Sequence, residues 1–523
     1  MAVAAAFFAV IAVISTAGCH LPPSLEVIGI DSGKVRGALV NEVWTYFGIP
    51  YAAAPIGDLR WREPQPVVPW DGIRDVTKFG PACPQPKSVL YDVGQTSEDC
   101  LYLNIWSPAK TVKDDLPVMV WIHGGSFITG TGSSKMYDGM NLAKQNVIVV
   151  TINYRLGPFG FLSHPLLSKE SQHGVSGNYG LLDQIAALNW VKKNIKAFGG
   201  KPDRITVWGE SAGAASVCDL MVSPLAHGLF QRAIAESGSF SDAFPQNRDD
   251  MVDKAEKTGQ QVAAALGCDK ADNVLAAMRL KSADEVMAAA FTDYDPNQSV
   301  KFRPVVDGWV IPDNPWSLFT AGKQEKVPLL IGTNADEGTI FVIPDPKVAK
   351  MSEQDYRDYV TSVYGDHASD VIAAFPAVSK ADVPIAMSKL RTVLAMSAGA
   401  LHAADTTVIN KSRVFQYQFT RIPDTPLKMF GAFHGLEIFY VFGNLKADKV
   451  SIPDDKIDTE LSQAMTKYWC NFAKTGDPND PKLPKWPAYS VDKRQYLELG
   501  DKITAKSDLY KEYFGLIDEI VTK

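Results

Sequence analysis

The sequence predicts an α/β protein with a large, mostly parallel central sheet and helices on both of its faces. Short apolar runs rich in β-branched residues, such as 117–122 and 147–153, are typical of strands that are covered on both faces. Longer segments of helical periodicity separate these runs along most of the chain. The 523 residues, of which 46% are hydrophobic and 21% charged, supply enough apolar material for a large core.

The expected strands follow one another at short intervals. β-Rich runs open the chain after residue 24, and a Pro-rich connection over 55–84 follows them. The strongest helix is predicted over 181–198, where apolar residues recur at helical spacing before two glycines end the pattern. We expect strands over residues 25–31, 34–40, 43–51, 101–106, 117–122, 147–153, 205–208, 232–236, 327–333 and 414–420.

Helical segments fill the larger gaps between these strands. Residues 248–290 have a helical pattern without a strand signal, and such an insertion between sheet strands fits a cap over a site. No internal repeat, low-complexity tract or flexible linker follows residue 24, so we expect residues 25–523 to form a single domain. Further helices are expected over residues 352–410, 458–474 and 507–521.

Residues 1–19 differ from the rest of the chain. Residues 1–14 are almost wholly apolar and small residues follow, which predicts a secretory signal peptide rather than a membrane span or a buried N-terminal element. The positively charged segment that usually opens a signal peptide is missing, since no Lys or Arg precedes the apolar run. The stretch from Thr16 to Cys19 also resembles a bacterial lipoprotein cleavage site, which makes Cys19 a candidate for a lipid anchor. We therefore expect an exported protein that is periplasmic, secreted or an outer-membrane lipoprotein.

Composition and spacing exclude several classes of partner. The formal net charge is −7 and the basic residues form no stripe, so we expect no nucleic acid partner. No later apolar run approaches the roughly 18 residues of a transmembrane helix. The sequence has neither C-x-x-C nor H-x-x-x-H spacing, so we expect no metal site. The oligomeric state cannot be inferred from these features.

The cysteines divide into two kinds. Cys83 and Cys100 flank a loop rich in Pro, Ser and Gly, and this placement predicts a disulfide in an oxidising compartment. Cys218, Cys268 and Cys470 fall in predicted helices or at their ends, where we expect buried thiols.

The chemistry centres on residues 205–213, with the sequence Ile-Thr-Val-Trp-Gly-Glu-Ser-Ala-Gly. A β-rich run meets a tight turn around Ser211, and small helix-compatible residues follow at once. The small residues Gly209 and Gly213 permit a turn so tight that the hydroxyl stands exposed above the sheet. The amide of Ala212, the first of the helix, would point at the group that the serine attacks. Ser211 is therefore the candidate nucleophile.

A serine nucleophile needs a base, and the base needs an orienting carboxylate. In α/β-hydrolases, which carry this serine motif, the acid follows the serine and the histidine comes last. His227 comes too soon after Ser211 for an acid-bearing strand to intervene, and His367 and His402 fall in helical segments typical of ordinary surface or core residues. His434 lies in a glycine-flanked loop after a predicted strand, so we expect it to be the base.

The acid and the oxyanion donors are also expected at strand ends. The strand over 327–333 is followed by Asp336 and Glu337, and position alone leaves open which of them is the acid or whether both are solvated turn residues. Gly124 and Gly125 directly follow the buried strand over 117–122, where bare amides could approach an oxyanion.

Together these residues resemble the carboxylesterase type B family, the cholinesterase-like branch of the α/β-hydrolases. The resemblance covers nearly the whole chain from about Val27 to its end, so it depends on many motifs in order rather than on one. The motifs that carry it are FGIPYA at 47–52, SEDCLYLN at 97–104, NYRLG at 153–157, GNYGLLDQ at 177–184, FGG at 198–200 and FAKTGDPN at 472–479.

The resemblance implies an α/β-hydrolase fold with helical cap insertions, and it implies roles for single residues. The acid of the triad is then the glutamate immediately before a glycine, Glu337, rather than Asp336. The oxyanion donors are then the backbone amides of Gly125, Ser126 and Ala212.

The resemblance also implies a disulfide between Cys83 and Cys100, and it shows two departures from the family. Many members have a third glycine where this chain has Ser126, whose amide can still donate but whose side chain would narrow the site. The family's second small disulfide would join Cys268 to a residue near position 277, which here is Ala277, so we expect Cys268 to be free.

We therefore expect a serine hydrolase that cleaves small carboxylic esters through an acyl-enzyme, with Ser211, Glu337 and His434 as the triad and no metal or organic cofactor. One alternative is a catalytically silent binding or adhesion protein on the same scaffold, which the presence of all three residues disfavours. Another is a specialised esterase that acts on feruloyl, carbamate or lipid esters. An aromatic content of 10% does not choose among acyl and alcohol groups.

Overall fold

The structure is a computed structural model, and its centre is an 11-stranded sheet with the order β16-β15-β12-β11-β10-β9-β7-β8-β6-β4-β3. It describes residues 25–87, 93–240, 248–292, 301–447, 450–453 and 455–522, so the predicted signal peptide and Cys19 lie outside the described residues. The strands of this sheet are β3 Ala38–Val40, β4 Val43–Pro50, β6 Tyr102–Ser107, β7 Leu116–Ile122, β8 Ile148–Ile152, β9 Gly200–Glu210, β10 Arg232–Glu236, β11 Leu329–Asn334, β12 Val414–Phe419, β15 Tyr496–Leu499 and β16 Ile503–Lys506.

The strands are parallel in the middle of the sheet and antiparallel at its edges. From β8 through β7, β9, β10, β11 and β12 to β15, every neighbouring pair is parallel. Strands β3, β4 and β6 at one edge and β16 at the other pair antiparallel with their neighbours. The carboxyl ends of the parallel strands share one edge of the sheet, and this is the edge at which the loops after β9, β11 and β12 meet.

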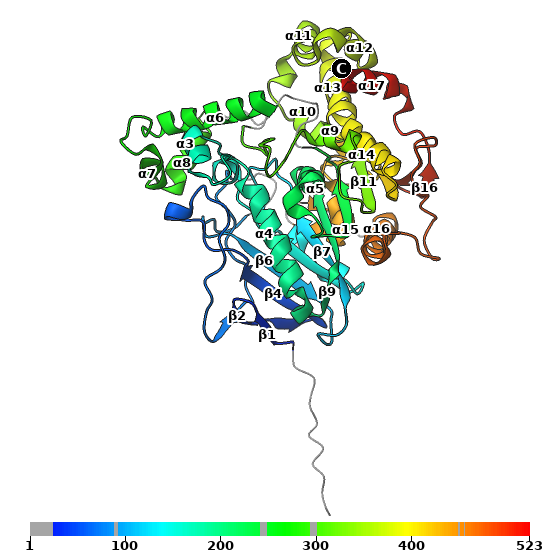
Figure 1. Cartoon of the computed structure of the whole chain (residues 1–523). Helices are drawn as coiled ribbons and strands as arrows, with labels where there is room; N and C mark the ends of the chain where they lie inside the picture. The colour runs from blue at the N-terminus through cyan, green and yellow to red at the C-terminus, as the bar shows by residue number, and fades with distance from the viewer. Residues whose placement is uncertain are drawn as a thin grey trace, which may run out of the picture.

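Helices cover both faces of the sheet because its strands are apolar on both faces (Figure 1). Strand β7 illustrates this: Val120 packs into one apolar core and its neighbour Trp121 into the other. Helices α4 and α5 cover the first core and α15 and α16 the second, over Tyr179–Asn194, Ala212–Val222, Leu436–Phe442 and Lys456–Thr475. The predicted α/β fold class with two covered faces is confirmed.

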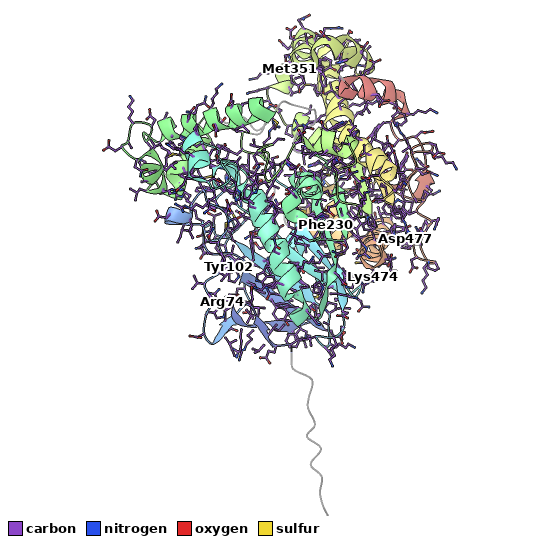
Figure 2. The ribbon with its side chains drawn as sticks, in the orientation of Figure 1. Arg74, Tyr102, Phe230, Met351, Lys474 and Asp477 are labelled. Carbon is purple, nitrogen blue, oxygen red and sulfur yellow. A yellow bond between two sulfur atoms is a disulfide. The ribbon has the colours of Figure 1, made fainter. Side chains whose placement is uncertain are left out.

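Two helical insertions extend beyond the sheet, at the upper left and at the top of Figure 1. Residues 352–410 form the upper one, which has an apolar core of its own that includes Tyr356, Val360 and Val383. Figure 2 shows Met351 at the edge of this region, far from Arg74 and Tyr102 at the opposite end of the molecule. The insertion helices are α6 Arg248–Ala265, α7 Val274–Arg279, α8 Ala283–Ala290, α11 Glu353–Tyr364, α12 Ala368–Ala374, α13 Val383–Leu390 and α14 Ala398–Ile409, with a π-helix over Arg391–Ser397.

The remaining elements are short. A separate three-stranded sheet has the order β1-β2-β5, and β13 pairs with β14. Among the described helices, none is long and apolar enough to span a membrane. The short strands and helices are β1 Val27–Ile30, β2 Gly33–Arg36, β5 Ile73–Asp75, β13 Lys446–Ala447, β14 Val450–Ser451, α1 Met140–Ala143, α2 Gly157–Phe161, α3 Pro165–Glu170, α9 Pro315–Thr320, α10 Thr339–Val342 and α17 Phe514–Thr522.

The structure differs from the predicted elements in several places. The strand expected over 34–40 is two strands in different sheets, because the chain breaks at Gly37, where a Cβ atom would lie 2.4 Å from the ring of Tyr46. The helix expected over 507–521 begins only at Phe514. The antiparallel hairpin of β15 and β16 was not expected, because its strands are only four residues long and carry little periodicity.

The predicted disulfide is present. Cys83 and Cys100 are joined across a separation of 17 residues. Cys218, Cys268 and Cys470 are free and buried, as expected. The N-terminal loops that precede the oxyanion segment are therefore covalently closed.

Candidate active site

Ser211 occupies a strained turn between β9 and α5. Its backbone has φ 56° and ψ −120°, a conformation that L-residues rarely adopt and that persists only when the surroundings enforce it. Here a Cβ atom on Gly209 would lie 2.5 Å from the carbonyl carbon of Gly213, and one on Gly213 would lie 2.0 Å from the carbonyl oxygen of Ile122. The small residues on either side of the serine are therefore required, as the sequence predicted.

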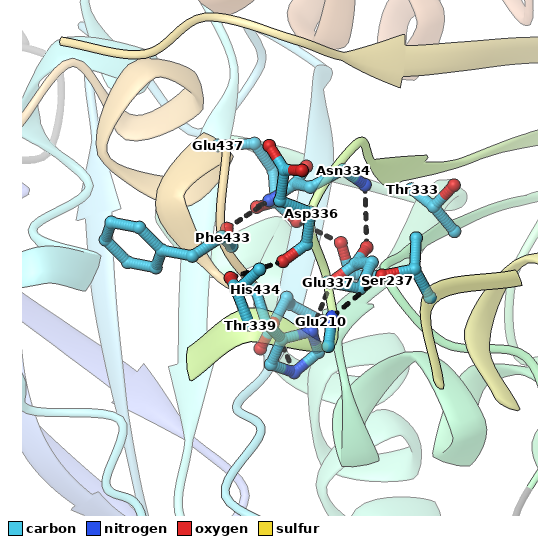
Figure 3. Close-up of polar contacts among 12 residues, drawn as sticks. Glu210, Ser237, Thr333, Asn334, Asp336, Glu337, Thr339, Phe433, His434 and Glu437 are labelled. Atoms are coloured by element: carbon cyan, nitrogen blue, oxygen red, sulfur yellow. Dashed lines mark hydrogen bonds and ion pairs between the residues drawn. The ribbon is translucent and has the colours of Figure 1, made fainter. Parts of the chain in front are cut away.

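The structure brings Glu337, and not Asp336, to His434 (Figure 3). Oε2 of Glu337 lies 2.6 Å from Nδ1 of His434, and the backbone N–H of Asn334 donates to Oε1 of Glu337 at 2.6 Å. Asp336 instead accepts the backbone N–H of Ala432 at 2.8 Å. The two acids that position alone left open therefore have different tasks: Glu337 orients the imidazole, and Asp336 holds the loop that carries it.

Neighbouring strand ends place these two loops together. Strands β11 and β12 are paired in parallel, so the loops after Asn334 and Phe419 leave the same edge of the sheet. Asp336 and Phe433 form a single parallel bridge between the loops. The hydroxyl of Thr339 donates to the carbonyl oxygen of Phe430 at 2.6 Å. The loop that carries His434 is therefore held by backbone pairing as well as by the carboxylate of Glu337.

The second nitrogen of His434 faces another carboxylate. Nε2 lies 3.1 Å from Oε1 of Glu210, the residue directly before Ser211. Within the described part of the chain, the hydroxyl of Ser211 makes no hydrogen bond. Burial alone would lower the pKa of His434, but the carboxylates of Glu210 and Glu337 outweigh burial and raise it. Burial also raises the pKa of Glu210, and the positive charge of the His434 imidazolium partly offsets this effect.

Two more buried glutamates lie behind the imidazole. Glu437 accepts the hydroxyl of Ser237 at 2.6 Å and also pairs with the side-chain amide of Asn334. Glu236 accepts the indole N–H groups of Trp208 and Trp469 on one oxygen. Burial raises the pKa of both carboxyl groups, because each is fully enclosed.

Sequence reasoning assigned no role to Glu210, Glu236 or Glu437. Two of them were within reach of that reasoning, since Glu210 precedes the nucleophile and Glu437 lies three residues after His434. Glu236 ends β10 and gave no signal, because its partners come from strand β9 and helix α16. Glu210 and Glu437 act electrostatically on His434, and Glu236 acts on those two glutamates.

The loop after β7, which the sequence predicts to carry oxyanion donors, has an unusual backbone. Gly125 has φ 106° and Ser126 has φ 55°, both in the left-handed region. A Cβ atom on Gly125 would lie 2.1 Å from the carbonyl oxygen of Thr129, so no side chain fits there. Among the described residues, the amides of Gly125 and Ser126 donate to no protein group, which leaves them for a ligand.

A cavity of about 410 Å³ opens at these groups. Ser126, Ser211 and Ala212 line it, so the candidate nucleophile and two of the expected oxyanion donors share one space. The upper insertion contributes much of the opposite wall, including Leu390 and Leu394. The region from 352 to 410 therefore forms part of the site.

The other three histidines that follow Ser211 lie outside the candidate site. His227 contacts Glu325 at 2.5 Å on the surface, and His367 lies in a turn before helix α12. His402 stacks on Trp316 with ring centroids 3.9 Å apart, and burial lowers its pKa to about 4. None of the three reaches the cavity that holds Ser211.

A strained serine at the end of a parallel strand, with a carboxylate–histidine pair on later loops at the same sheet edge, defines an α/β-hydrolase. The sequence model of the carboxylesterase family matches residues 24–516. The chain therefore belongs to the carboxylesterase family, and it is a carboxylic-ester hydrolase.

Relatives of known sequence and structure agree with this assignment. Fumonisin B1 esterase of Sphingopyxis macrogoltabida is 38% identical over 471 residues, which are 88% of this chain and 84% of that protein. Para-nitrobenzyl esterase of Bacillus subtilis is 38% identical over 500 residues, 92% and 96% of the two chains. A carboxylesterase structure from Geobacillus stearothermophilus has a TM-score of 0.83 at 36% identity and covers 95% of this chain and 99% of its own.

Proposed function

We propose that Ser211, His434 and Glu337 form the catalytic triad of this esterase and that hydrolysis proceeds through an acyl-enzyme. The observation that carries the proposal is the 2.6 Å contact between Glu337 and His434 beside the cavity that Ser211 lines. Glu337 holds the imidazole with Nδ1 as the protonated nitrogen, which leaves Nε2 as the basic nitrogen. Nε2 faces Glu210, the residue directly before Ser211.

Acylation begins when Ser211 Oγ attacks the ester carbonyl and His434 takes its proton. The Oγ–C bond forms as the carbonyl π pair moves onto oxygen, and the imidazolium that results is stabilised by Glu337 and Glu210. His434 then gives the proton to the leaving alkoxide oxygen, and the alcohol departs. Water repeats the sequence on the acyl-enzyme, which releases the acid and restores Ser211.

The amides of Gly125, Ser126 and Ala212 serve as the oxyanion hole. Two observations support this role: the backbone is left-handed at Gly125 and Ser126, and among the described residues their amides have no protein acceptor. The amide of Ala212 is the first of helix α5 and has no partner within the helix. Loss of one such donor costs about 3 kcal/mol of transition-state stabilisation.

We further propose that the protein is exported and that residues 25–523 act as a single domain. The disulfide between Cys83 and Cys100 supports an oxidising compartment. Residues 1–19 would then be removed as a signal peptide. In the lipoprotein form, cleavage would instead fall before Cys19, which would become the lipidated N-terminal residue. Mass spectrometry of the mature N-terminus from the native host distinguishes an unmodified start from a lipidated Cys19, and an intact Met1 would contradict export.

The triad is tested directly with an organophosphate that phosphorylates serine esterases, such as paraoxon. We expect loss of activity in step with one label, located on the peptide that contains Ser211. Wild-type protein that is fully inactivated with the label on another residue would contradict the assignment. A Ser211→Ala protein that still takes the label would contradict it equally.

A further inference from the structure

The cavity beside Ser211 carries a charge that the hydrolytic steps do not use. Arg303 and Arg391 line it, and among the described residues its lining includes no Asp or Glu. The other described lining side chains are apolar or bear hydroxyl groups. A hydrolase for uncharged esters needs no cation in this wall, so the ligand of the Arg391 guanidinium has to be sought in the substrate.

Among the described residues, Arg391 has no anionic partner. Its guanidinium carbon lies 4.4 Å from the centroid of the Phe341 ring, and within the described chain it forms neither a hydrogen bond nor an ion pair. Burial lowers its pKa, an effect that Tyr359 and Tyr364 partly offset, and an arginine remains charged at neutral pH. A partly buried cation without a counter-ion is costly, and a carboxylate bound in a fork by two N–H groups would remove that cost.

Arg391 also lies near the reacting groups. The Phe341 ring beneath its guanidinium contacts the imidazole of His434, with ring centroids 5.1 Å apart. Arg391 is therefore separated from the base by a single aromatic side chain. Ser211 and Arg391 line the same cavity, so a substrate with its ester carbon at Ser211 can extend toward the guanidinium.

A hydrogen bond connects the helix that carries Arg391 to the loop that carries Glu337. It begins the π-helix Arg391–Ser397, a form that often marks functional sites because it re-aims side chains. The next residue, Thr392, accepts the backbone N–H of Gly338 at 2.9 Å, and Gly338 directly follows Glu337. The loop of the acid and the helix of the arginine are thus joined by a hydrogen bond.

We propose that Arg391 binds a free carboxylate of the substrate, so that the enzyme prefers esters bearing a second, ionised carboxyl group to neutral esters of the same length. The inference rests on the proposed hydrolysis at Ser211 and names its substrate class. With monoethyl glutarate, the reaction consumes one water and yields glutarate, ethanol and one proton.

Two matched pairs of esters test this preference on either side of the scissile bond. Monoethyl glutarate against ethyl hexanoate places the charge on the acyl side, and 4-acetoxybutanoate against pentyl acetate places it on the alcohol side. Proton release in a pH-stat gives kcat/KM for each. We expect the charged member to be preferred in at least one pair, and the pair identifies which side of the ester faces Arg391.

The variant Arg391→Met is expected to lower kcat/KM for the preferred charged ester about 10- to 100-fold, the worth of a charged hydrogen-bonded contact. The neutral partner should change less than about twofold, and Arg391→Lys should fall between, since it keeps the charge but loses the fork. Arg413→Met is the matched control, because Arg413 is 54% exposed and pairs with Asp477 outside the cavity lining. It should leave the ratio between charged and neutral esters unchanged.

A second measurement needs no variant. Glutarate should inhibit the hydrolysis of p-nitrophenyl acetate by the wild-type enzyme competitively and more strongly than pentanoate does. Equal inhibition, together with equal rates within both ester pairs, would overturn the carboxylate site and leave the esterase proposal intact.

The ratio of kcat/KM between charged and neutral esters also tests the choice of residue. If that ratio collapses only in Arg303→Met, the assignment to Arg391 is overturned. Absence of turnover for all four esters and for p-nitrophenyl acetate would instead refute the proposed hydrolysis.

Discussion

Oε2 of Glu337 and Nδ1 of His434 lie 2.6 Å apart, although 97 residues separate them in the sequence. The parallel pairing of β11 and β12 closes this separation, because it sends both loops out at one edge of the sheet. Glu337 is 0% exposed, so little water screens its charge from the imidazole. This pair orients the imidazole of His434, and its geometry yields the first prediction.

Separate substitutions of Glu337 and Asp336 distinguish the roles of these two neighbouring acids. Glu337→Gln should lower kcat about 10²- to 10⁴-fold, because an amide neither fixes the imidazole tautomer nor stabilises the imidazolium. Asp336→Asn should keep kcat within about tenfold, because Asp336 contacts the backbone of Ala432 rather than the imidazole. Steady-state hydrolysis of p-nitrophenyl butyrate measures both. The reverse order of losses would contradict the assignment of Glu337.

Removal of the nucleophile should abolish turnover without unfolding the protein. Ser211→Ala is expected to lower kcat about 10⁴-fold or more, because no other group can carry the acyl chain. Its melting temperature should stay near that of the wild type, measured by circular dichroism. The exposed Ser507 provides the control, and Ser507→Ala should have wild-type activity. Undiminished turnover in Ser211→Ala would rule out the acyl-enzyme mechanism at this residue.

The carboxylate beside Nε2 should control the pH dependence of the reaction. His434 acts as base only when neutral, and Glu210 and Glu337 overcome the effect of burial and raise its pKa to about 9. The value of kcat/KM should therefore rise with pH through the range up to about 9. Glu210→Gln removes one of the charges that favour the imidazolium, so the rise should move to lower pH by about one unit or more.

The corresponding control lies on helix α16. The side chain of Glu460 is 67% exposed, so Glu460→Gln changes the net charge equally without touching the site. Its pH profile should match that of the wild type. A profile of Glu210→Gln that stays in place or moves to higher pH would show that Glu210 does not raise the pKa of His434.

The disulfide should contribute to stability more than to catalysis. Replacement of Cys83 and Cys100 by serine opens a loop of 17 residues and should lower the free energy of unfolding by about 3 kcal/mol. Denaturant titration measures this difference. Dithiothreitol should destabilise the wild type toward the level of the double variant and leave the variant unaffected, since the other described cysteines are free. Equal stability of the two oxidised proteins would count against a stabilising role.

Local patterns were sufficient for most of the central strands and for the turn that carries Ser211. The apolar runs over 117–122 and 232–236 became β7 and β10, because the side chains of a doubly covered strand have no other place to be buried. The turn at Ser211 was equally predictable, since only small residues permit it. Such features depend on neighbours in the sequence, and those neighbours are visible in it.

Contacts between distant segments were decided only by the tertiary structure. The sequence by itself determined the strands, the elbow at Ser211 and a histidine loop in the right chain order. Position left Asp336 and Glu337 equivalent, and only the register between β11 and β12 directs one of them to His434. The acid at Glu236 and the cation at Arg391 gave no local signal, because burial and pairing depend on which strands and helices become neighbours, and periodicity along one segment does not encode that order.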